Sequence, residues 1–449
     1  MRFAHLVAIG VAGLTFCQSP SALAAHWGPP EDLSKLPGLG INPSVGIDRA
    51  GHAYAAWLEN SSQAFEEVVM VSDRPVGGVW TRPKRLTPRG GIAYFAQIAV
   101  SADGDAALTW ADNYAGSVRV SFRAAGHRWR PAHTLSTSSA SQPAVAIDRR
   151  GNVIATWVAD SATGRHQVHV ASRRRSTGRW TRDITLSTGA DGFGPRVASN
   201  ARGQAALVWS TPTRSGDDEV HGATGRVGGA RWTVRKLGDE SDGGHPPSDA
   251  TFPRPDIAVD GRGSATAVWT ADAGQEVVSR LHARGAARWS RTRHLSRGLP
   301  GLHPKVAAAP KRGAVAAWTS PVGQRAAAMA ARRVGYGAWG APHVLSAPGV
   351  DDTEAAIAVD GAGRAVAGWD RAVFEEDSPG ATRSSGWVVQ AATMTTRGQW
   401  RAPVDLSKRG ENAGRPVLTL SPGGDGLAAW QRPIGEQGIV VQAAAYKRP

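Results

Sequence analysis

Cysteine is almost absent from this sequence, whose 449 residues include one Cys, four Met and five Tyr. One Cys cannot form an intramolecular disulfide and cannot build a cysteine-rich metal site. After the N-terminal segment, no run is both long and apolar enough to span a membrane as a helix, so we predict no transmembrane segment. These absences exclude a disulfide scaffold and a helical membrane protein.

Signatures of catalysis are also missing. The motifs H-E-x-x-H and G-x-S-x-G and the phosphate-binding P-loop do not occur, and the dinucleotide-like run Gly361–Gly368 falls in a repeated hairpin turn. We therefore predict no catalytic residue, no cofactor and no metal site. Glycoside hydrolysis stays open, because it needs two carboxylates across one bond and the run Glu375–Asp377 supplies carboxylates.

Lysine is scarce and acidic residues are outnumbered, with 37 Asp and Glu against 52 Lys and Arg. The formal net charge of +15 therefore rests mainly on arginine. A basic surface attracts polyanions. A GC-rich coding sequence would give the same arginine bias, so composition alone leaves the partner open.

The first 24 residues have the pattern of a secretory signal peptide. A positive charge precedes an apolar core from Leu6 to Phe16, and the A-L-A sequence ending at Ala24 matches the cleavage motif. Phe16 stands where a lipoprotein signal has a small residue, which favours cleavage over lipidation at Cys17. We predict a secreted protein, extracellular or associated with the cell wall, that comprises residues 25–449 and has lost its only cysteine.

Tryptophan is plentiful and occurs in a repeated pattern. The stretch Pro143–Trp157, P-A-V-A-I-D-R-R-G-N-V-I-A-T-W, returns in seven variants at intervals of about fifty residues. A period of this length with strand signals indicates a repeat architecture. The eight units, numbered here in chain order, end this stretch at Trp57, Trp110, Trp157, Trp209, Trp269, Trp318, Trp369 and Trp430.

The residue pattern of each unit predicts four β-strands. An alternating Val and Ile run forms the first strand, a polar residue with a glycine three positions later forms the turn, and the second strand ends on the repeat Trp. Two more strands form a hairpin that carries another recurring Trp. Four antiparallel strands per unit are typical of a propeller blade. We predict an all-β fold, a single β-propeller of eight four-stranded blades, with repeat units from about residue 41 to 449.

The N-terminal segment resembles the strand that the last unit lacks. Unit eight has three predicted strands, whereas W-G-P-P-E-D-L-S at Trp27–Ser34 matches W-R-A-P-V-D-L-S at Trp400–Ser407. We predict that residues 26–34 add the outer strand of the last blade and close the ring, which leaves no unpaired edge at the seam.

The recurring Trp residues are more typical of structure than of binding. We predict that the sixteen that follow the repeat are wedged between adjacent sheets, because aromatic side chains bury much apolar area there. Trp387 lies outside the pattern beside an insertion, and it remains a candidate platform for a ligand.

A binding site is predicted on the face where the units differ. The first hairpin turns have constant length, whereas insertions at Gly238–Phe252 and Asp370–Gly386 fall at the opposite end of the units. Binding residues concentrate on variable loops held by a rigid scaffold. Residues just before each first strand should ring the mouth of a central channel, and with Trp387 the candidate ligand-binding residues are Asn42, Gln142, Arg254, His303, Glu354 and Arg415. Polar residues that merely line a solvated opening would give the same pattern.

Arginines gather in the turns between the third and fourth strands, on the face opposite the variable loops. Examples are Arg123–Arg130, Arg173–Trp180 and His282–His294. They predict a basic rim that attracts anionic polymers such as wall polymers, acidic glycans or nucleic acid. A solvated face with biased codon usage is the alternative.

The pattern P-x-[IV]-A-[IV]-D-x-x-G-x-[AV]-x-A-x-W resembles the repeat of secreted bacterial propeller proteins placed near the sialidase-like propellers. The resemblance covers essentially all of the mature chain and implies the propeller fold. The Asp boxes and the F/Y-R-I-P motif of sialidases are missing, so the resemblance carries over no catalytic residue.

We expect a monomeric, secreted, non-catalytic propeller that binds glycan or cell-surface ligands through its variable face. Two alternatives stay open. One is a glycoside hydrolase or lyase of the sialidase-like propeller type. The other is an envelope-associated scaffold that binds polyanions through its Arg-rich face.

Overall fold

The computed structural model describes residues 26–61, 66–88, 90–112, 116–213, 218–240, 255–271, 276–309, 313–322, 325–346, 352–378 and 381–448. All regular elements in these ranges are β-strands. Within them, no helix has the length and apolarity needed to cross a membrane. The predicted signal peptide, residues 1–24, lies outside the described residues.

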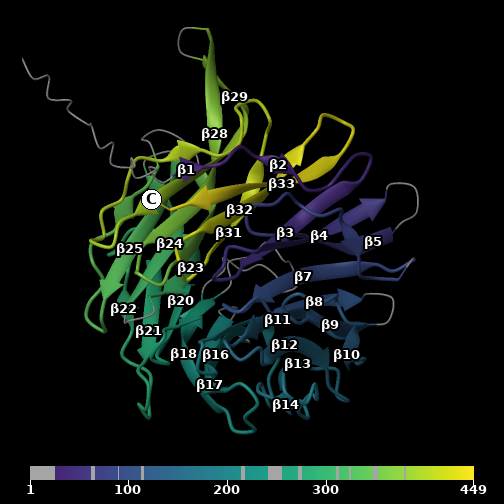
Figure 1. The fold of residues 1–449 in the computed structure, drawn as a ribbon. Helices are drawn as coiled ribbons and strands as arrows, with labels where there is room; N and C mark the ends of the chain where they lie inside the picture. Colours follow the sequence, from purple (N-terminus) through teal and green to yellow (C-terminus); the bar gives the residue numbers. More distant parts are fainter. Residues whose placement is uncertain are drawn as a thin grey trace, which may run out of the picture.

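The strands repeat in sets, and Figure 1 shows the sets arranged around a common centre. The first strands are β3 (Leu39–Ile47), β7 (Ala93–Val100), β11 (Ser141–Ile147), β15 (Phe193–Ser199), β19 (Asp256–Val259), β23 (Leu302–Ala308), β27 (Asp352–Val359) and β31 (Gly414–Leu420). The second strands are β4 (Ala53–Ser61), β8 (Ala106–Asp112), β12 (Val153–Asp160), β16 (Gln204–Pro212), β20 (Ala265–Ala271), β24 (Gly313–Val322), β28 (Ala365–Ser378) and β32 (Gly426–Pro433).

The outer half of each unit is a second hairpin. The third strands are β5 (Glu66–Arg74), β9 (Ser117–Arg123), β13 (His166–Arg173), β17 (Asp218–Arg226), β21 (Glu276–His282), β25 (Arg325–Val334), β29 (Ala381–Met394) and β33 (Ile439–Lys447). The fourth strands are β6 (Lys84–Arg85), β10 (His133–Ser136), β14 (Ile184–Thr185), β18 (Thr233–Glu240), β22 (Arg293–His294), β26 (His343–Val344) and β30 (Val404–Asp405). In units two to seven, each set forms one antiparallel four-stranded sheet, which confirms the predicted strand content.

The turn residues explain why the first hairpin recurs. In unit three, the Asp148 carboxylate accepts the Asn152 backbone N–H at 2.9 Å, and the Asp148 carbonyl accepts the Gly151 N–H at 3.0 Å. Gly151 has φ 74°, a left-handed conformation that residues with a Cβ adopt at a cost. The Asp and Gly of the repeat therefore fix the turn that joins its first two strands.

The repeat Trp residues form the centre of the packing between sheets. All eight are at most 1% exposed, and each packs with Val, Leu and Ala side chains of its own and a neighbouring unit. For these eight of the sixteen, the prediction that they are wedged between sheets is confirmed. In the second set, Trp339 is buried and the other seven are only partly buried.

The first strands contact one another in sequence around the axis. Each packs against the first strand of the next unit, and β31 of unit eight packs against β3 of unit one. At their C-terminal ends, Val45, Ile47, Ile98, Val145 and other mainly apolar residues line a narrow cavity of about 380 Å³.

The N-terminal segment pairs with the last strand. In β1 (His26–Trp27) and β2 (Glu31–Asp32), His26 lies opposite Lys447 and Glu31 opposite Ala443, both antiparallel to β33. One parallel pair, Leu39 with Ile439, joins this sheet to unit one.

Two predicted loops have a different form. The insertion of unit seven, expected as a loop, continues the strands β28 and β29 as a long hairpin that projects from the body in Figure 1. The predicted insertion after Gly238 begins inside β18, whose last residue is Glu240. The rest of that insertion lies mostly outside the described residues.

Truncating Leu33 tests whether the N-terminal segment belongs to the folded body. Leu33 is 4% exposed and packs with Trp57 and Val441. We expect Leu33→Ala to lower the free energy of unfolding by about 2–5 kcal/mol, measured by urea denaturation. Leu406→Ala, at the matching place in unit seven and equally buried, should cost a similar amount. A loss in the second variant without one in the first would contradict the docking of this segment.

Candidate functional site

Four of the predicted channel-mouth residues lie in left-handed bulges inside the first strands, and for these four the prediction that they precede the strands is wrong. Asn42, Gln142, His303 and Arg415 have φ between 50° and 58°, and the register of each strand shifts at this point. An extra residue in one strand breaks the apolar alternation, so the sequence pattern shows the strand only after the bulge.

The bulges also bind neighbouring units. The Gln142 side chain accepts the backbone N–H of Gly194, the bulge residue of the next unit, at 2.6 Å. The Asn42 side chain accepts from Gln431 at 3.4 Å, and the backbone N–H of Arg415 donates to Asp370 at 3.3 Å. These contacts give the ring of bulges a structural role, and its predicted role in binding stays a prediction.

The other predicted residues are placed less fully. Arg254 lies outside the described residues. Glu354 lies in β27, but its side chain is not among those described. Trp387 lies in β29 opposite Ala372 and is partly buried. Its backbone N–H donates to the Asn412 side chain at 3.1 Å.

Two carboxylates near the bulges have basic side chains as partners. Asp112 pairs with Arg119 at 3.1 Å, and Asp160 accepts from His166 at 2.6 Å. Among the described residues, no group of three His, Cys, Asp or Glu side chains is placed to hold a metal ion.

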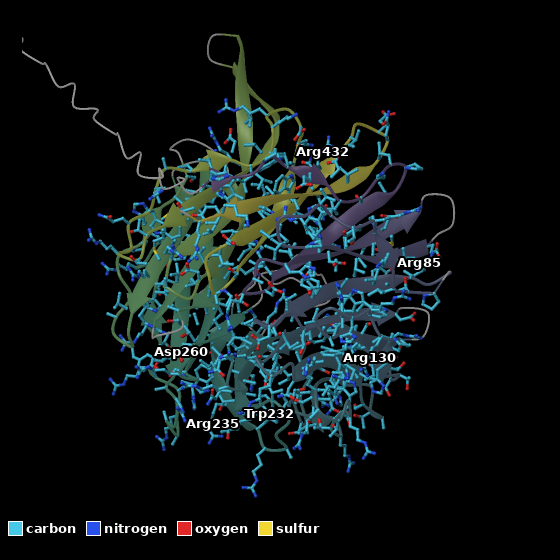
Figure 2. All side chains as sticks on the ribbon, viewed as in Figure 1. Arg85, Arg130, Trp232, Arg235, Asp260 and Arg432 are labelled. Carbon is cyan, nitrogen blue, oxygen red and sulfur yellow. The ribbon has the colours of Figure 1, made fainter. Side chains whose placement is uncertain are left out.

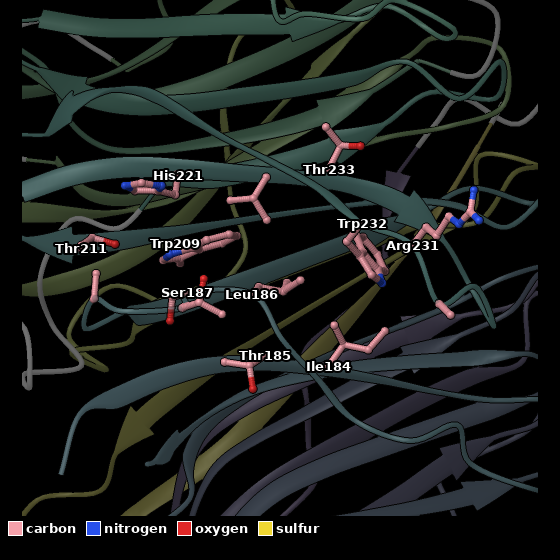
Figure 3. Close-up of a pocket in the computed structure, with 14 residues that line it drawn as sticks. Ile184, Thr185, Leu186, Ser187, Trp209, Thr211, His221, Arg231, Trp232 and Thr233 are labelled. Carbon is pink, nitrogen blue, oxygen red and sulfur yellow. The ribbon is translucent and has the colours of Figure 1, made fainter. Parts of the chain in front are cut away.

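A larger cleft lies between units three and four, away from the predicted site. Its volume is about 640 Å³ (Figure 3). One wall is β14 with the chain after it, and the other is formed by β16, β17, β18 and the turn before β18. In Figure 3, Trp209 and His221 lie toward one end of the cleft, and Trp232 and Arg231 lie toward the other.

Two buried polar atoms at this cleft lack partners. Trp209 is 1% exposed and Thr211 is 5% exposed, and both line the cleft. Neither the Trp209 Nε1 nor the Thr211 Oγ1 has a hydrogen-bond partner among the described residues. The Nε1 atoms of Trp157, Trp318 and Trp369 are also unpaired, but of these four residues only Trp209 lines the cleft. Buried polar atoms without partners are costly, and a polar ligand would satisfy this pair.

Trp232 lies in the cleft wall because the strand beneath it has a glycine. A Cβ on Gly225 would come within 2.6 Å of the Trp232 ring, so the ring rests on bare backbone. The residues at this register position in units one to eight are Arg74, Arg123, Arg173, Gly225, His282, Arg333, Met394 and Tyr446.

Elsewhere the same position fills the space between sheets. Arg173 lies over the Phe122 ring of the preceding unit at 4.1 Å, and Arg333 donates to Thr266 of the preceding unit at 2.6 Å. Burial lowers the pKa of the Arg333 guanidinium to about 10. Unit four has no such side chain. Gly225 is thus a signal in the sequence that pattern analysis of the Trp residues missed.

The preceding interface is closed at the corresponding place. His133 of β10 stacks on Trp180 with ring centroids 5.8 Å apart and an interplanar angle of 6°. Ile184 takes the register position of His133 at the next interface, where it lines the cleft. An aliphatic side chain in place of a stacked ring leaves one face of the cleft apolar.

His221 is held by its neighbours. Its ring stacks on Trp209 at 5.7 Å, and its Nε2 lies 3.0 Å from Glu219. Hydrogen bonds from Lys236 and His221 lower the pKa of the Glu219 carboxyl. Among the described residues no Asp or Glu lines the cleft, so this part of the lining lacks the carboxylate pair that glycoside hydrolysis needs.

Acid should weaken the matching Trp–His pair of unit three. His169 stacks on Trp157, and burial lowers its pKa below the ordinary value although Asp183 opposes the shift. The unfolded chain then binds a proton first, so stability falls as the pH drops through about 6.5. We expect His169→Gln to flatten the decline of the melting temperature between about pH 7.5 and 5. His343→Gln, an exposed control, should leave the decline unchanged; identical curves for both variants and the parent would contradict this.

No family model matches the chain, and no curated protein matches it. Among solved structures, it is similar to the BP39L lectin from Burkholderia pseudomallei, with a TM-score of 0.52 and 17% identity over 82% of this chain and 100% of that one. The fold is a β-propeller. At this identity the likeness concerns the fold alone.

Two more distant propeller-like structures align with lower scores. The β-propeller domain of the Trilobed protease from Pyrococcus furiosus has a TM-score of 0.44 and 6% identity over 83% of this chain and 96% of that one. The α-L-arabinofuranosidase Arb93A from Fusarium graminearum has a TM-score of 0.40 and 12% identity over 69% and 96%. Scores this low support no functional argument.

Proposed function

We propose that this protein is a non-catalytic carbohydrate-binding propeller, whose ligand occupies the cleft between units three and four. One observation carries the proposal: a buried N–H donor on Trp209 and a buried hydroxyl on Thr211, both unpaired, share the cleft with the ring of Trp232.

A sugar matches this combination of surfaces. A pyranose has an apolar C–H face and equatorial hydroxyls that both donate and accept hydrogen bonds. The Trp232 ring offers a flat apolar surface for the C–H face, and the Trp209 N–H and Thr211 hydroxyl offer hydrogen bonds to the sugar hydroxyls. The cleft volume of about 640 Å³ is in the range of small-ligand sites. That the BP39L neighbour is a lectin gives a further reason to test saccharides.

The proposal extends to the architecture and location of the protein. We propose that the eight units form one ring, which the N-terminal strands on β33 complete as the outer strand of the last blade. The contact between β31 and β3 supports this closure. We also propose export as a monomer after cleavage at Ala24, which the mass of the secreted protein would test.

A glycan array with residues 25–449 tests the function, with Trp232→Ala and Trp80→Ala as a pair. Both Trp residues hold the same place in their units, but only Trp232 lines this cleft. We expect saturable binding without product release, reduced at least about tenfold by Trp232→Ala and retained by Trp80→Ala.

Gly225→Arg tests the cleft without removing an aromatic ring. Arginine occurs at this position in four other units, and its Cβ would displace the Trp232 ring. We expect the variant to lose binding, and a cooperative thermal unfolding transition would show that it is still folded. Binding that survives in both cleft variants would place the site elsewhere, and release of sugar products would favour a glycoside hydrolase.

A further inference from the structure

The charged side chains that line the cleft between units three and four are of one sign, positive. Of the fourteen described residues that line it, Arg231 is the sole one with a permanent charge. Thr, Ser, Ala, Trp and aliphatic side chains make up nearly all of the rest, and His221 is already paired with Glu219. A ligand in this cleft therefore meets a guanidinium and no carboxylate among the lining side chains.

Arg231 is available to a ligand. It is exposed in the turn between β17 and β18, and it makes no ion pair or hydrogen bond with any described residue. The acidic residues near the cleft are engaged: Asp183 lies 3.2 Å from His169, and Glu219 lies 2.8 Å from Lys236. In the part of the chain that the structure describes, no carboxylate forms an ion pair with the Arg231 guanidinium.

The surroundings add to the positive potential. Arg182, two residues before Ile184, is exposed. Arg235 is also exposed and donates only to the backbone carbonyl of Val234, at 2.8 Å. It lies opposite Gly222, on the face of the sheet that is turned to Trp289 of unit five. Figure 2 shows Trp232 and Arg235 close together at the lower edge of the molecule, where many nitrogen-tipped side chains project. Such a surface raises the local concentration of anions and speeds their association at low salt.

We propose that the saccharide bound in this cleft is acidic, a uronic acid unit whose carboxylate is held by Arg231. This rests on the proposed function and adds the class of sugar. The planar guanidinium fork makes two parallel hydrogen bonds to a carboxylate, while the sugar ring lies on Trp232. The Trp209 N–H and the Thr211 hydroxyl, toward the other end of the cleft, then bind hydroxyls of a further sugar unit of the same oligosaccharide.

The repeat offers a matched control for charge. Arg288 stands directly before the second Trp of unit five, as Arg231 does in unit four. It too is exposed and has no hydrogen bond or ion pair with the described residues, but it does not line the cleft. Removing either side chain changes the net charge of the protein by the same amount, so a difference in binding reports on the cleft.

Calorimetric titration with an oligogalacturonate tetrasaccharide and with its methyl-esterified form tests the proposal, because esterification removes the charge and keeps the sugar. We expect the free acid to bind at least about tenfold more tightly than the ester. Arg231→Ala should abolish that preference and Arg231→Lys should retain only part of it, whereas Arg288→Ala should leave it intact.

The other outcomes separate this inference from the proposed function. Equal binding of acid and ester would overturn the acidic ligand and leave carbohydrate binding standing. Equal losses in Arg231→Ala and Arg288→Ala, together with tight binding of any sulfated glycan and steep weakening by salt, would indicate a diffuse polyanion surface instead. No saccharide binding in the titration or on the array would remove both proposals.

Discussion

Burial of one tryptophan per unit between adjacent sheets is the interaction on which this structure depends. A single four-stranded sheet exposes two faces and cannot bury either alone. The repeat Trp, fully buried in each unit, fills the space where two sheets diverge and ties each sheet to its neighbours. The turn chemistry of Asp148 and Gly151 fixes the strand that carries the Trp, so hairpin and packing recur together.

The cleft of the proposed function lies where that packing is incomplete. One third-strand position differs at this interface: it is arginine in units one, two, three and six and glycine in unit four. The arginines of units three and six reach the preceding sheet, at the expense of a buried charge. The glycine leaves the Trp232 ring on bare backbone beside a cleft. A position whose side chain joins two sheets in units three and six thus leaves space for a ligand in unit four.

The fold follows from the sequence more fully than the site does. Strand content, the hairpin turn and the buried Trp set depend on local patterns that repeat, and the match between Trp27–Ser34 and Trp400–Ser407 pointed to the pairing with β33. The bulges at Asn42 and Gln142 were misplaced, because a left-handed residue interrupts the alternation by which strands are identified. The cleft was missed because it depends on an absent side chain at Gly225 and on contacts between units, neither of which creates a motif.

The pairing of β1 and β2 with β33 has a consequence for the order of folding. His26 and Lys447 are partners in one sheet, so that sheet contains contacts between the two most distant parts of the described chain. Contacts of such high sequence separation form late. The chain must lose the conformational entropy of closing a long loop before packing at the contact can stabilise it. Each of units two to seven forms a sheet from its own four strands, whereas β1 and β2 cannot pair until β33, the last strand, is available. A chain in which β33 has not yet paired would keep the sheets of units two to seven but expose β1, β2 and an open sheet edge. This partly folded species is the one most prone to pair with another molecule.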